Sequence, residues 1–189
     1  MKFRASYSIL NVWQSGNYER AVEMYFKLKE FTTRAMHEGK EKHKEWEEEV
    51  KKTGKMPIVF GGKQLFNPKT ELKIVRQLDD WLELVGKIDL LDETTIYDWK
   101  YGKIPSERYA NGFQPKTYQI LIPKAKRAEI HHYDPISKRA DMSIIHLTEK
   151  TLKDAIEWCV TNASEMHSYF QDNKLYERFQ AQLDKKKHD

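Results

Sequence analysis

The sequence predicts an α/β fold in which helices flank a central mixed β-sheet, with helical regions at both ends of the chain. Three observations lead to this prediction. Helical periodicity dominates residues 1–56, alternating apolar segments with one helix among them occupy residues 70–147, and helical periodicity returns over residues 148–189. Strands that are grouped around a helix and enclosed by other helices are typical of a layered α/β or α+β domain.

Two helical segments are expected before the sheet. A short helix should cover residues 6–13. A longer helical pattern starts at Asn17, a good N-cap residue, runs to about Lys52 and stops at Gly54. We expect a break in this pattern near Thr32-Thr33.

Five strands are expected, in two groups. The first group of three should form a meander, and the second group of two should follow the helix that comes after it. The strands are expected at roughly residues 70–78, 81–91, 94–101, 128–133 and 142–147.

The remaining segments are a loop and three helices. Residues 102–112 are polar and are expected to form a loop. A helix should follow over residues 113–124, with Pro115 in its first turn, where a missing N–H costs least. Thr148 is a suitable N-cap for a helix to about residue 170, and a last helix should start near Lys174 and fray into Lys185-Lys186-Lys187.

The composition indicates one domain over residues 1–189 and excludes several kinds of protein. The net charge of +4 is too small for a histone-like polycation, and 33% of the residues are charged. A single cysteine, Cys159, excludes an internal disulfide, a cysteine-based zinc site and an iron–sulfur cluster within one chain. No apolar run has transmembrane length and no apolar signal block opens the chain, so we expect a cytoplasmic protein without a membrane partner.

Two carboxylates and a lysine in neighbouring predicted strands carry the strongest chemical signal. Asp98 and Lys100 are two residues apart and therefore share a strand face. If the chain turns back through Glu93-Thr94, Asp89 lies opposite Asp98 on that face, where like charges are destabilising without a partner. A divalent cation such as Mg²⁺ or Mn²⁺ would supply that partner. The alternative is a pair of solvated acids at the strand ends.

The role of Lys100 is open between three possibilities at this stage. Its amine could orient and help to deprotonate an attacking water, or it could balance charge in a phosphoryl transition state. A simple ion pair with Asp98 is the third possibility. Two carboxylates with such a lysine suit metal-assisted hydrolysis of a phosphodiester.

His43 is a further candidate for the same site. It lies on a helical stripe with Met36, Gly39, Trp46 and Val50, at spacings that place these residues on one face. A glycine inside a helix costs about 1 kcal/mol relative to alanine, which close approach to another element would justify. The alternative is a core histidine with an ordinary hydrogen bond.

Gln114 and Tyr118 share a face of the later helix, being four residues apart, and either could contact a base, a phosphate or the catalytic water. An exposed pair on the helix surface is the alternative.

Residues that could bind a nucleic acid follow or precede this helix. They are the lysines and the arginine Lys124, Lys126 and Arg127, expected near the site, and the aromatic residues Tyr109 and Phe113, which could stack on unpaired bases. The alternative for the charged run is a solvated face.

Four short motifs together resemble the PD-(D/E)XK nuclease superfamily, in particular its RecB-like branch. The family pattern consists of G-x-x-x-H, G-x-[IV]-D, D-x-K and Q-x-x-x-Y. The chain carries them in this order as Gly39-Lys-Glu-Lys-His43, Gly86-Lys-Ile-Asp89, Asp98-Trp-Lys100 and Gln114-Pro-Lys-Thr-Tyr118. The resemblance covers roughly residues 6–133 and includes lambda-exonuclease-like and CRISPR-associated RecB-like exonucleases, although the cysteines of the latter are missing.

The resemblance implies a restriction-endonuclease-like core and specific roles in a site. It implies that His43, Asp89, Asp98 and the backbone carbonyl of Trp99 bind Mg²⁺ or Mn²⁺, that Lys100 is the catalytic lysine, and that the Gln114–Tyr118 motif positions the substrate or the lysine.

The resemblance also implies a function with alternatives. We expect a metal-dependent DNA exonuclease that acts on single-stranded or end-containing DNA, in a prokaryotic or phage-encoded protein. A recombination or replication protein could be its partner, and it could form a homo-oligomer. A structure-specific endonuclease of the junction-resolvase type and a catalytically silent nucleic-acid-binding module are the alternatives, and an RNA substrate stays open.

Overall fold

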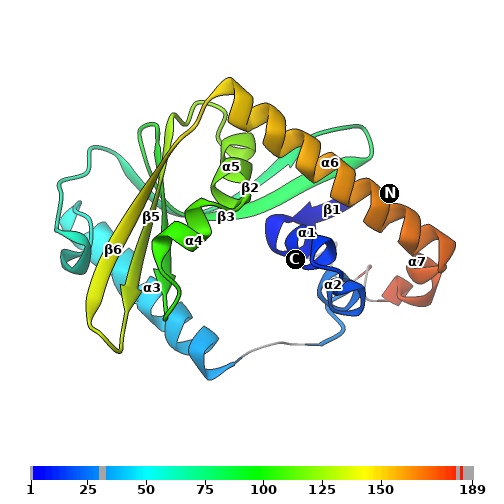
Figure 1. Cartoon of the computed structure of the whole chain (residues 1–189), viewed down its shortest axis with the longest axis horizontal. Coiled ribbons are helices and arrows are strands. Elements are labelled where there is room, and N and C mark those ends of the chain that lie inside the picture. The colour runs from blue at the N-terminus through cyan, green and yellow to red at the C-terminus, as the bar shows by residue number, and fades with distance from the viewer. Residues whose placement is uncertain (1, 30–32, 182–183, 185–189) are drawn as a thin grey trace. The chain divides into compact units, whose positions relative to one another are not determined.

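The computed structural model describes residues 2–29, 33–181 and 184 of the chain. The described residues form the predicted α/β fold, in which six strands make a mixed sheet flanked by helices (Figure 1). The chain divides into two compact units. The first unit comprises residues 1–31, 75–85 and 156–189, and the second unit comprises residues 32–74 and 86–155. The prediction of a single domain remains a prediction.

The first unit contains a strand that was not expected. β1 (Phe3–Ser6) pairs in parallel with residues 82–85, which begin β3 (Leu82–Asp92). Phe3 and Ala5 are buried and Arg4 is exposed, which is the alternation of a half-buried strand. Four residues are too few for this period to be recognised in the sequence.

The helices of the first unit largely follow the predictions. α1 (Tyr7–Gln14) is capped by Ser6, and α2 (Tyr18–Tyr25) is capped by Asn17, whose side chain accepts from the Arg20 N–H. The C-terminal part of α6 (Glu149–Asp172) and the short α7 (Leu175–Arg178) complete the unit, and Figure 1 shows α7 directly after α6. The predicted tail Lys185-Lys186-Lys187 lies outside the described residues.

An aromatic cluster forms the core of this unit. The rings of Phe3 and Tyr25 stack with centroids 4.9 Å apart, and Phe170 of α6 contacts both. Burial raises the pKa of Tyr25 to about 12. The first unit therefore has an apolar core that ties its first stretch of chain to its third.

The strands of the second unit lie within three residues of their predicted ends. β3 and β4 (Thr95–Tyr101) are antiparallel, β4 and β5 (Arg127–Asp134) are parallel, and β5 and β6 (Arg139–His146) are antiparallel. β2 (Pro68–Gln77) pairs with β3, as the meander requires. The parallel pair is joined through a helical connection, which such a pair needs.

α3 (Arg34–Thr53) is the separate helix that follows the expected break. Thr33 caps its first turn by accepting from the Met36 N–H, and Gly54 ends it in the left-handed conformation that glycine adopts without strain. The predicted continuous pattern is thus divided between α2 and α3. The other residue of the predicted break, Thr32, lies outside the described part of the chain.

Two predictions about the second unit were wrong in detail. The stretch 102–112 contains a short helix, α4 (Ser106–Ala110), which packs along β5 and β6 (Figure 1). The next helix, α5 (Gln114–Leu121), has Pro115 at its start as expected but ends three residues early. Polar composition alone does not predict such a five-residue helix, because the group that caps its first turn belongs to a strand distant in sequence.

The core of the second unit fixes α3 on the sheet. Trp46 and Val50 of α3 pack with Leu90, Tyr97 and Trp99 in one buried cluster, which the 3₁₀ turn η1 (Ile58–Phe60) borders. Because side chains alternate along β4, the side chains between these positions point to the opposite face of the sheet. Among the helices in the described ranges, none combines the length and the apolar character needed to cross a membrane.

Candidate functional site

The hairpin between β3 and β4 brings the two predicted carboxylates together. Its register pairs Asp92 with Thr95 and Leu90 with Tyr97, so Asp89 and Asp98 follow as the next positions. The turn is the expected Glu93-Thr94, and Glu93 adopts a positive φ of 51°. At the carboxylates, the Trp99 N–H donates to Asp89 Oδ2 at 2.9 Å. The Asp89 side chain is thereby held against the backbone of β4.

Asp98 is deeply buried, with a side chain only 4% exposed. Tyr118 donates to its Oδ1 at 2.7 Å. The Lys100 ammonium lies 2.6 Å from its Oδ2, although Oδ2 accepts no hydrogen bond of good geometry. Burial raises the pKa of Asp98 above its ordinary value, and the nearby charge of Asp89 adds to this, while Lys100 opposes it.

Lys100 is held in its charged form in this arrangement. Burial disfavours the ammonium, but the charge of Asp98 outweighs burial and raises the pKa of Lys100. Its Nζ also lies 5.0 Å from the centroid of the Tyr109 ring, which is within cation–π distance. A protonated lysine stabilises negative charge and is a poor proton acceptor. The charged amine of Lys100 can therefore balance negative charge beside Asp98.

His43 reaches the carboxylates from α3. Its Nδ1 lies 3.6 Å from Asp89 Oδ2, and its ring meets the Trp99 ring edge-on with centroids 6.1 Å apart. Burial alone would raise the pKa of Asp89, but the bond to His43, the Trp99 N–H and the Lys100 charge together lower it. The two carboxyl groups therefore differ, because Asp89 favours ionisation and Asp98 resists it.

Gln114 and Tyr118 form a hydrogen-bonded chain that ends on Asp98. Gln114 Nε2 donates to the Tyr118 hydroxyl at 2.8 Å, and that hydroxyl donates to Asp98. Burial and then the Asp98 charge raise the pKa of Tyr118 well above its ordinary value, so the hydroxyl keeps its proton. Both residues thus orient a carboxylate from α5, and neither is the exposed pair that was the alternative.

The donor set fits a hard divalent cation, with one obstacle. His43 Nδ1 lies 3.6 Å from Asp89 Oδ2, and the buried Asp98 Oδ2 accepts no hydrogen bond, so a cation could serve as its partner. Within the described residues, however, no group of three His, Cys, Asp or Glu side chains is close enough to hold a metal. The Lys100 ammonium already neutralises Asp98. Lys100 would therefore have to move away from Oδ2 for this oxygen to bind a cation.

Of the residues predicted to bind nucleic acid, the aromatic ones lie nearest to the site. Tyr109 covers Lys100, and Phe113 precedes α5 with the Lys116 ammonium 4.7 Å from its ring centroid. Basic residues that were expected near the site lie elsewhere. Arg127 pairs with Thr95, whereas Lys100 pairs with His132, so Lys124, Lys126 and Arg127 sit at the opposite end of β4. Five residues along a strand correspond to roughly 17 Å.

Gly86 has a structural role that the motif alone did not reveal. A Cβ at this position would lie 2.2 Å from Leu121 Cδ1, which no real contact allows. The glycine therefore lets α5, and with it Tyr118, pack directly on β3. At Gly39, by contrast, a Cβ would meet only Tyr101 Cβ at an ordinary 3.9 Å. The expectation that close packing explains Gly39 was wrong.

Sequence reasoning also missed a polar network next to Lys100. The buried His132 bonds through Nε2 to the Gly102 carbonyl and through Nδ1 to Asp141 Oδ2, both at 2.6 Å. Both partners are oxygen atoms that accept hydrogen bonds, one belonging to a backbone carbonyl and one to a carboxylate. Asp141 Oδ1 in turn accepts from the Ser106 N–H at 2.8 Å, at the start of α4.

This network fixes the segment that leaves the site. Burial opposes ionisation of Asp141, but the bonds from Ser106 and His132 outweigh it and lower its pKa. The same bonds anchor α4 and so hold the Tyr109 ring over Lys100. Two adjacent histidines on a predicted buried strand were the only signal in the sequence, since the bonded residues are 9 to 35 positions apart.

Comparisons with known proteins identify a family and a fold. The family model described as the PD-(D/E)XK nuclease superfamily matches residues 4–187. No curated protein sequence is significantly similar to the chain. Two solved structures show the same fold at low identity. An alkaline exonuclease from Laribacter hongkongensis has a TM-score of 0.62 at 12% identity, covering 95% of this chain and 94% of that one. A phage related exonuclease from Haemophilus somnus has a TM-score of 0.53 at 18% identity, covering 84% and 82%.

Proposed function

The chain belongs to the PD-(D/E)XK nuclease superfamily, and from this premise we propose that it hydrolyses phosphodiester bonds of DNA with Mg²⁺ or Mn²⁺. The observation that carries the proposal is the convergence of Asp89, Asp98 and Lys100 on one face of the β3–β4 hairpin, with Tyr118 bonded to Asp98. Packing of an ordinary hairpin has no need for two adjacent carboxylates there.

The residues divide into three roles in this proposal. Asp89, Asp98, His43 and the Trp99 carbonyl would hold the cation, which supplies a nucleophilic hydroxide and stabilises charge on the leaving oxygen when bound. Lys100, once released from Asp98, stabilises negative charge on the phosphoryl oxygens. The Gln114–Tyr118 chain keeps Asp98 oriented through its Oδ1.

We favour an exonuclease that acts on single-stranded or end-containing DNA. Supporting this, the two solved structures described above are named exonucleases, and another structure of the Laribacter enzyme is a complex with dAMP. A structure-specific endonuclease is the second candidate, because the same carboxylates and lysine serve either product. We also propose the cytoplasm as its location and a recombination or replication protein, or a second copy of the chain, as its partner.

The test is cleavage of linear and covalently closed single-stranded DNA in Mg²⁺, Mn²⁺ or EDTA. Wild type is compared with Lys100→Ala and with Lys52→Ala, a control that removes an exposed lysine of α3 far from the site. We expect metal-dependent loss of the linear substrate only, abolished in Lys100→Ala and unchanged in Lys52→Ala. Cutting of the closed circle would replace the exonuclease by the endonuclease. Absence of cutting on any single-stranded, duplex or branched DNA would leave a binding module.

A further inference from the structure

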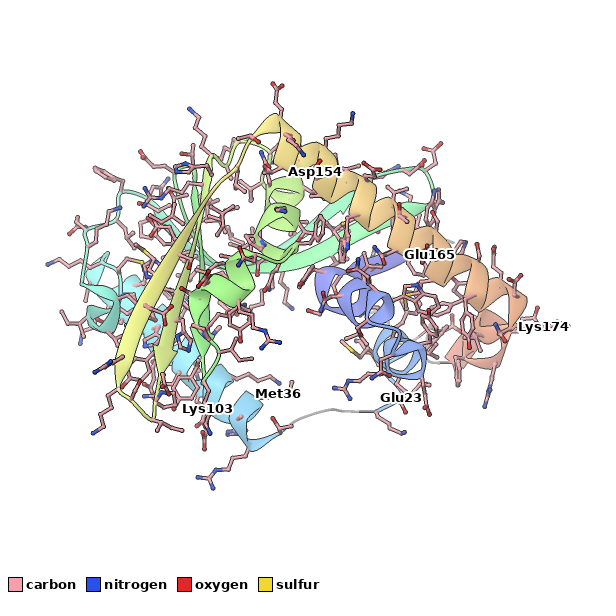
Figure 2. All side chains as sticks on the ribbon, viewed as in Figure 1. Glu23, Met36, Lys103, Asp154, Glu165 and Lys174 are labelled. Atoms are coloured by element: carbon pink, nitrogen blue, oxygen red, sulfur yellow. The ribbon has the colours of Figure 1, made fainter. Side chains whose placement is uncertain are left out.

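A cavity of about 660 Å³ opens beside the catalytic lysine in the second unit. The first two turns of α3 form one wall, through Met36, Gly39 and Lys40. The segment that leaves β4 forms the other, through Lys103 and Ile104, with Tyr109 of α4 alongside. Figure 2 shows Met36 and Lys103 on these two segments. His43, Trp99 and Lys100 connect the cavity to the carboxylate site.

The charge of the cavity is opposite to that of the carboxylates next to it. Its lining contains three lysines and a histidine, and among the described residues that line it none is acidic. Lys40 and Lys103 form no ion pair with any described residue, unlike Lys100. Unpaired lysines that converge without a carboxylate attract an anion, and phosphate is the anion that a nuclease must bind.

The walls between the lysines are apolar and are only partly covered. Met36 is 45% exposed and Ile104 is 41% exposed, although both are large apolar side chains on the cavity rim. Tyr109 and Tyr101 add aromatic surface. Flat apolar or aromatic surface beside cations is the combination that binds an unpaired base and its phosphate.

The missing side chain of Gly39 indicates that the cavity has to stay open. This glycine costs about 1 kcal/mol of helix stability relative to alanine. Packing does not require this cost, because a Cβ would make one ordinary contact of 3.9 Å. A side chain longer than alanine would enter the cavity instead. The glycine therefore lowers the stability of the helix. What it provides in return is free volume in the cavity next to His43.

The far wall of the cavity is preformed. His132 holds the Gly102 carbonyl, and Asp141 holds the start of α4, so both lining segments are anchored to β5 and β6 before any ligand arrives. Binding sites for small ligands are usually preformed in this way and measure about 300–1,000 Å³. The cavity fits a nucleotide in size and is too small for a base-paired duplex.

We infer that this cavity is a subsite for one unpaired deoxynucleotide of the strand being cut, which makes a single-stranded end the preferred substrate. The base packs on Met36, Ile104 and Tyr109, and Lys40 and Lys103 bind the flanking phosphates. This inference rests on the proposed function, since it names the substrate of that same site. It assigns to Gly39 and Lys40 a role in specificity.

The first experiment measures binding without cleavage. A short dye-labelled oligothymidylate and a duplex closed by hairpins at both ends are titrated in EDTA and followed by fluorescence anisotropy. Stacking of a base on an aromatic ring is worth about 1–3 kcal/mol, which converts to roughly 5- to 150-fold in affinity. We expect Gly39→Leu to weaken binding of the oligothymidylate within this range and to leave weak binding of the closed duplex unchanged.

Two further variants and one control distinguish loss of the subsite from loss of folding and from a general effect of charge on binding. Gly39→Ala should raise the melting temperature while the cavity stays largely open, which shows that the helix tolerates a side chain. Lys40→Glu should weaken binding of the oligothymidylate and reduce its salt dependence, by about 0.7 in the logarithmic slope for each phosphate that is no longer neutralised. Lys52→Glu makes the same charge change on α3, more than three turns away, and should have little effect.

Several outcomes would overturn the inference. Gly39→Leu that is folded and binds oligothymidylate like wild type would do so, as would equal weakening of the closed duplex. Metal-dependent cleavage by wild type combined with unchanged binding by Gly39→Leu would remove the subsite and leave the proposed function. Weakened binding by Gly39→Leu combined with no cleavage by wild type would support the subsite and remove the proposed function.

Discussion

Replacing Lys100 by methionine should expose how strongly the site depends on its internal cation. The substitution keeps an unbranched apolar stem and removes the ammonium 2.6 Å from Asp98 Oδ2. Asp98 would then be a buried carboxylate whose Oδ2 has no counter-charge in direct contact. We expect a large loss of stability in the absence of metal, in addition to the loss of cleavage.

The size of the loss can be estimated from the geometry. Two unit charges 2.6 Å apart attract by about 6 kcal/mol at an effective dielectric constant of 20. Because the variant no longer buries an ammonium, part of this is recovered, and removing one partner of a buried pair typically costs about 3–5 kcal/mol. For a domain of this size, that corresponds to a decrease in melting temperature of roughly 6–20 °C.

The direction in which the stability of Lys100→Met changes with pH can be predicted independently of the size of the loss. Burial already raises the pKa of Asp98, and loss of Lys100 should raise it further. The folded state then binds more protons than the unfolded state between the ordinary aspartate pKa and the raised one. Stability is therefore lost as the pH rises through that window. The deficit of Lys100→Met should be greater at pH 8 than at pH 5.

Urea unfolding in EDTA at both pH values measures this deficit. The double variant Lys100→Met/Asp98→Asn is the control, and it should recover most of the stability because no buried charge is left. Added Mn²⁺ should stabilise Lys100→Met more than wild type, since no ammonium competes for Asp98. A stability within about 0.5 kcal/mol of wild type at pH 8, or a deficit that grows toward acid pH, would refute the reasoning.

Three further outcomes test the surroundings of the site. Gly86→Ala should cost about 1–3 kcal/mol in urea unfolding, because its Cβ would overlap Leu121 Cδ1, and adding Leu121→Ala should relieve that overlap; additive losses would contradict this. Asp141→Ala removes the acceptor of two buried donors, so we expect a loss of about 1–3 kcal/mol together with slower cleavage at unchanged metal affinity, and full activity would disprove the anchoring of α4. Cys159 is buried with a pKa raised to about 12 by burial, so a thiol reagent at pH 8 should modify it only after unfolding, and rapid reaction of the native protein would show that α6 opens there.

Apart from the four-residue β1, the strands of the sheet could be predicted, because apolar segments in the sequence indicate them directly. The Asp89–Asp98 register followed from one turn, Glu93-Thr94, although this dipeptide is a weak turn signal. The positive φ of Glu93 shows why, since the strands on both sides impose that conformation on a residue that does not prefer it. Long-range pairing outweighs local preference at this turn.

What could not be predicted depends on contacts between residues distant in sequence. Arg127 follows α5 directly, and only the parallel pairing of β4 with β5 reveals that it lies at the other end of the strand from Lys100. The hydrogen bond between His132 and the Gly102 carbonyl joins residues 30 positions apart, and no local sequence pattern predicts it. The cavity likewise combines two segments about 60 residues apart, from α3 and from the end of β4.

The interleaving of the two units along the chain has a consequence for the order in which they are made. All residues of the second unit, which carries Asp89, Asp98 and Lys100, have been synthesised once residue 155 is added. The first unit still lacks its third segment, residues 156–189, which includes most of α6 with Phe170 of its aromatic core. Since domains generally fold as units during synthesis, the second unit has all of its residues before the first unit can complete its aromatic core.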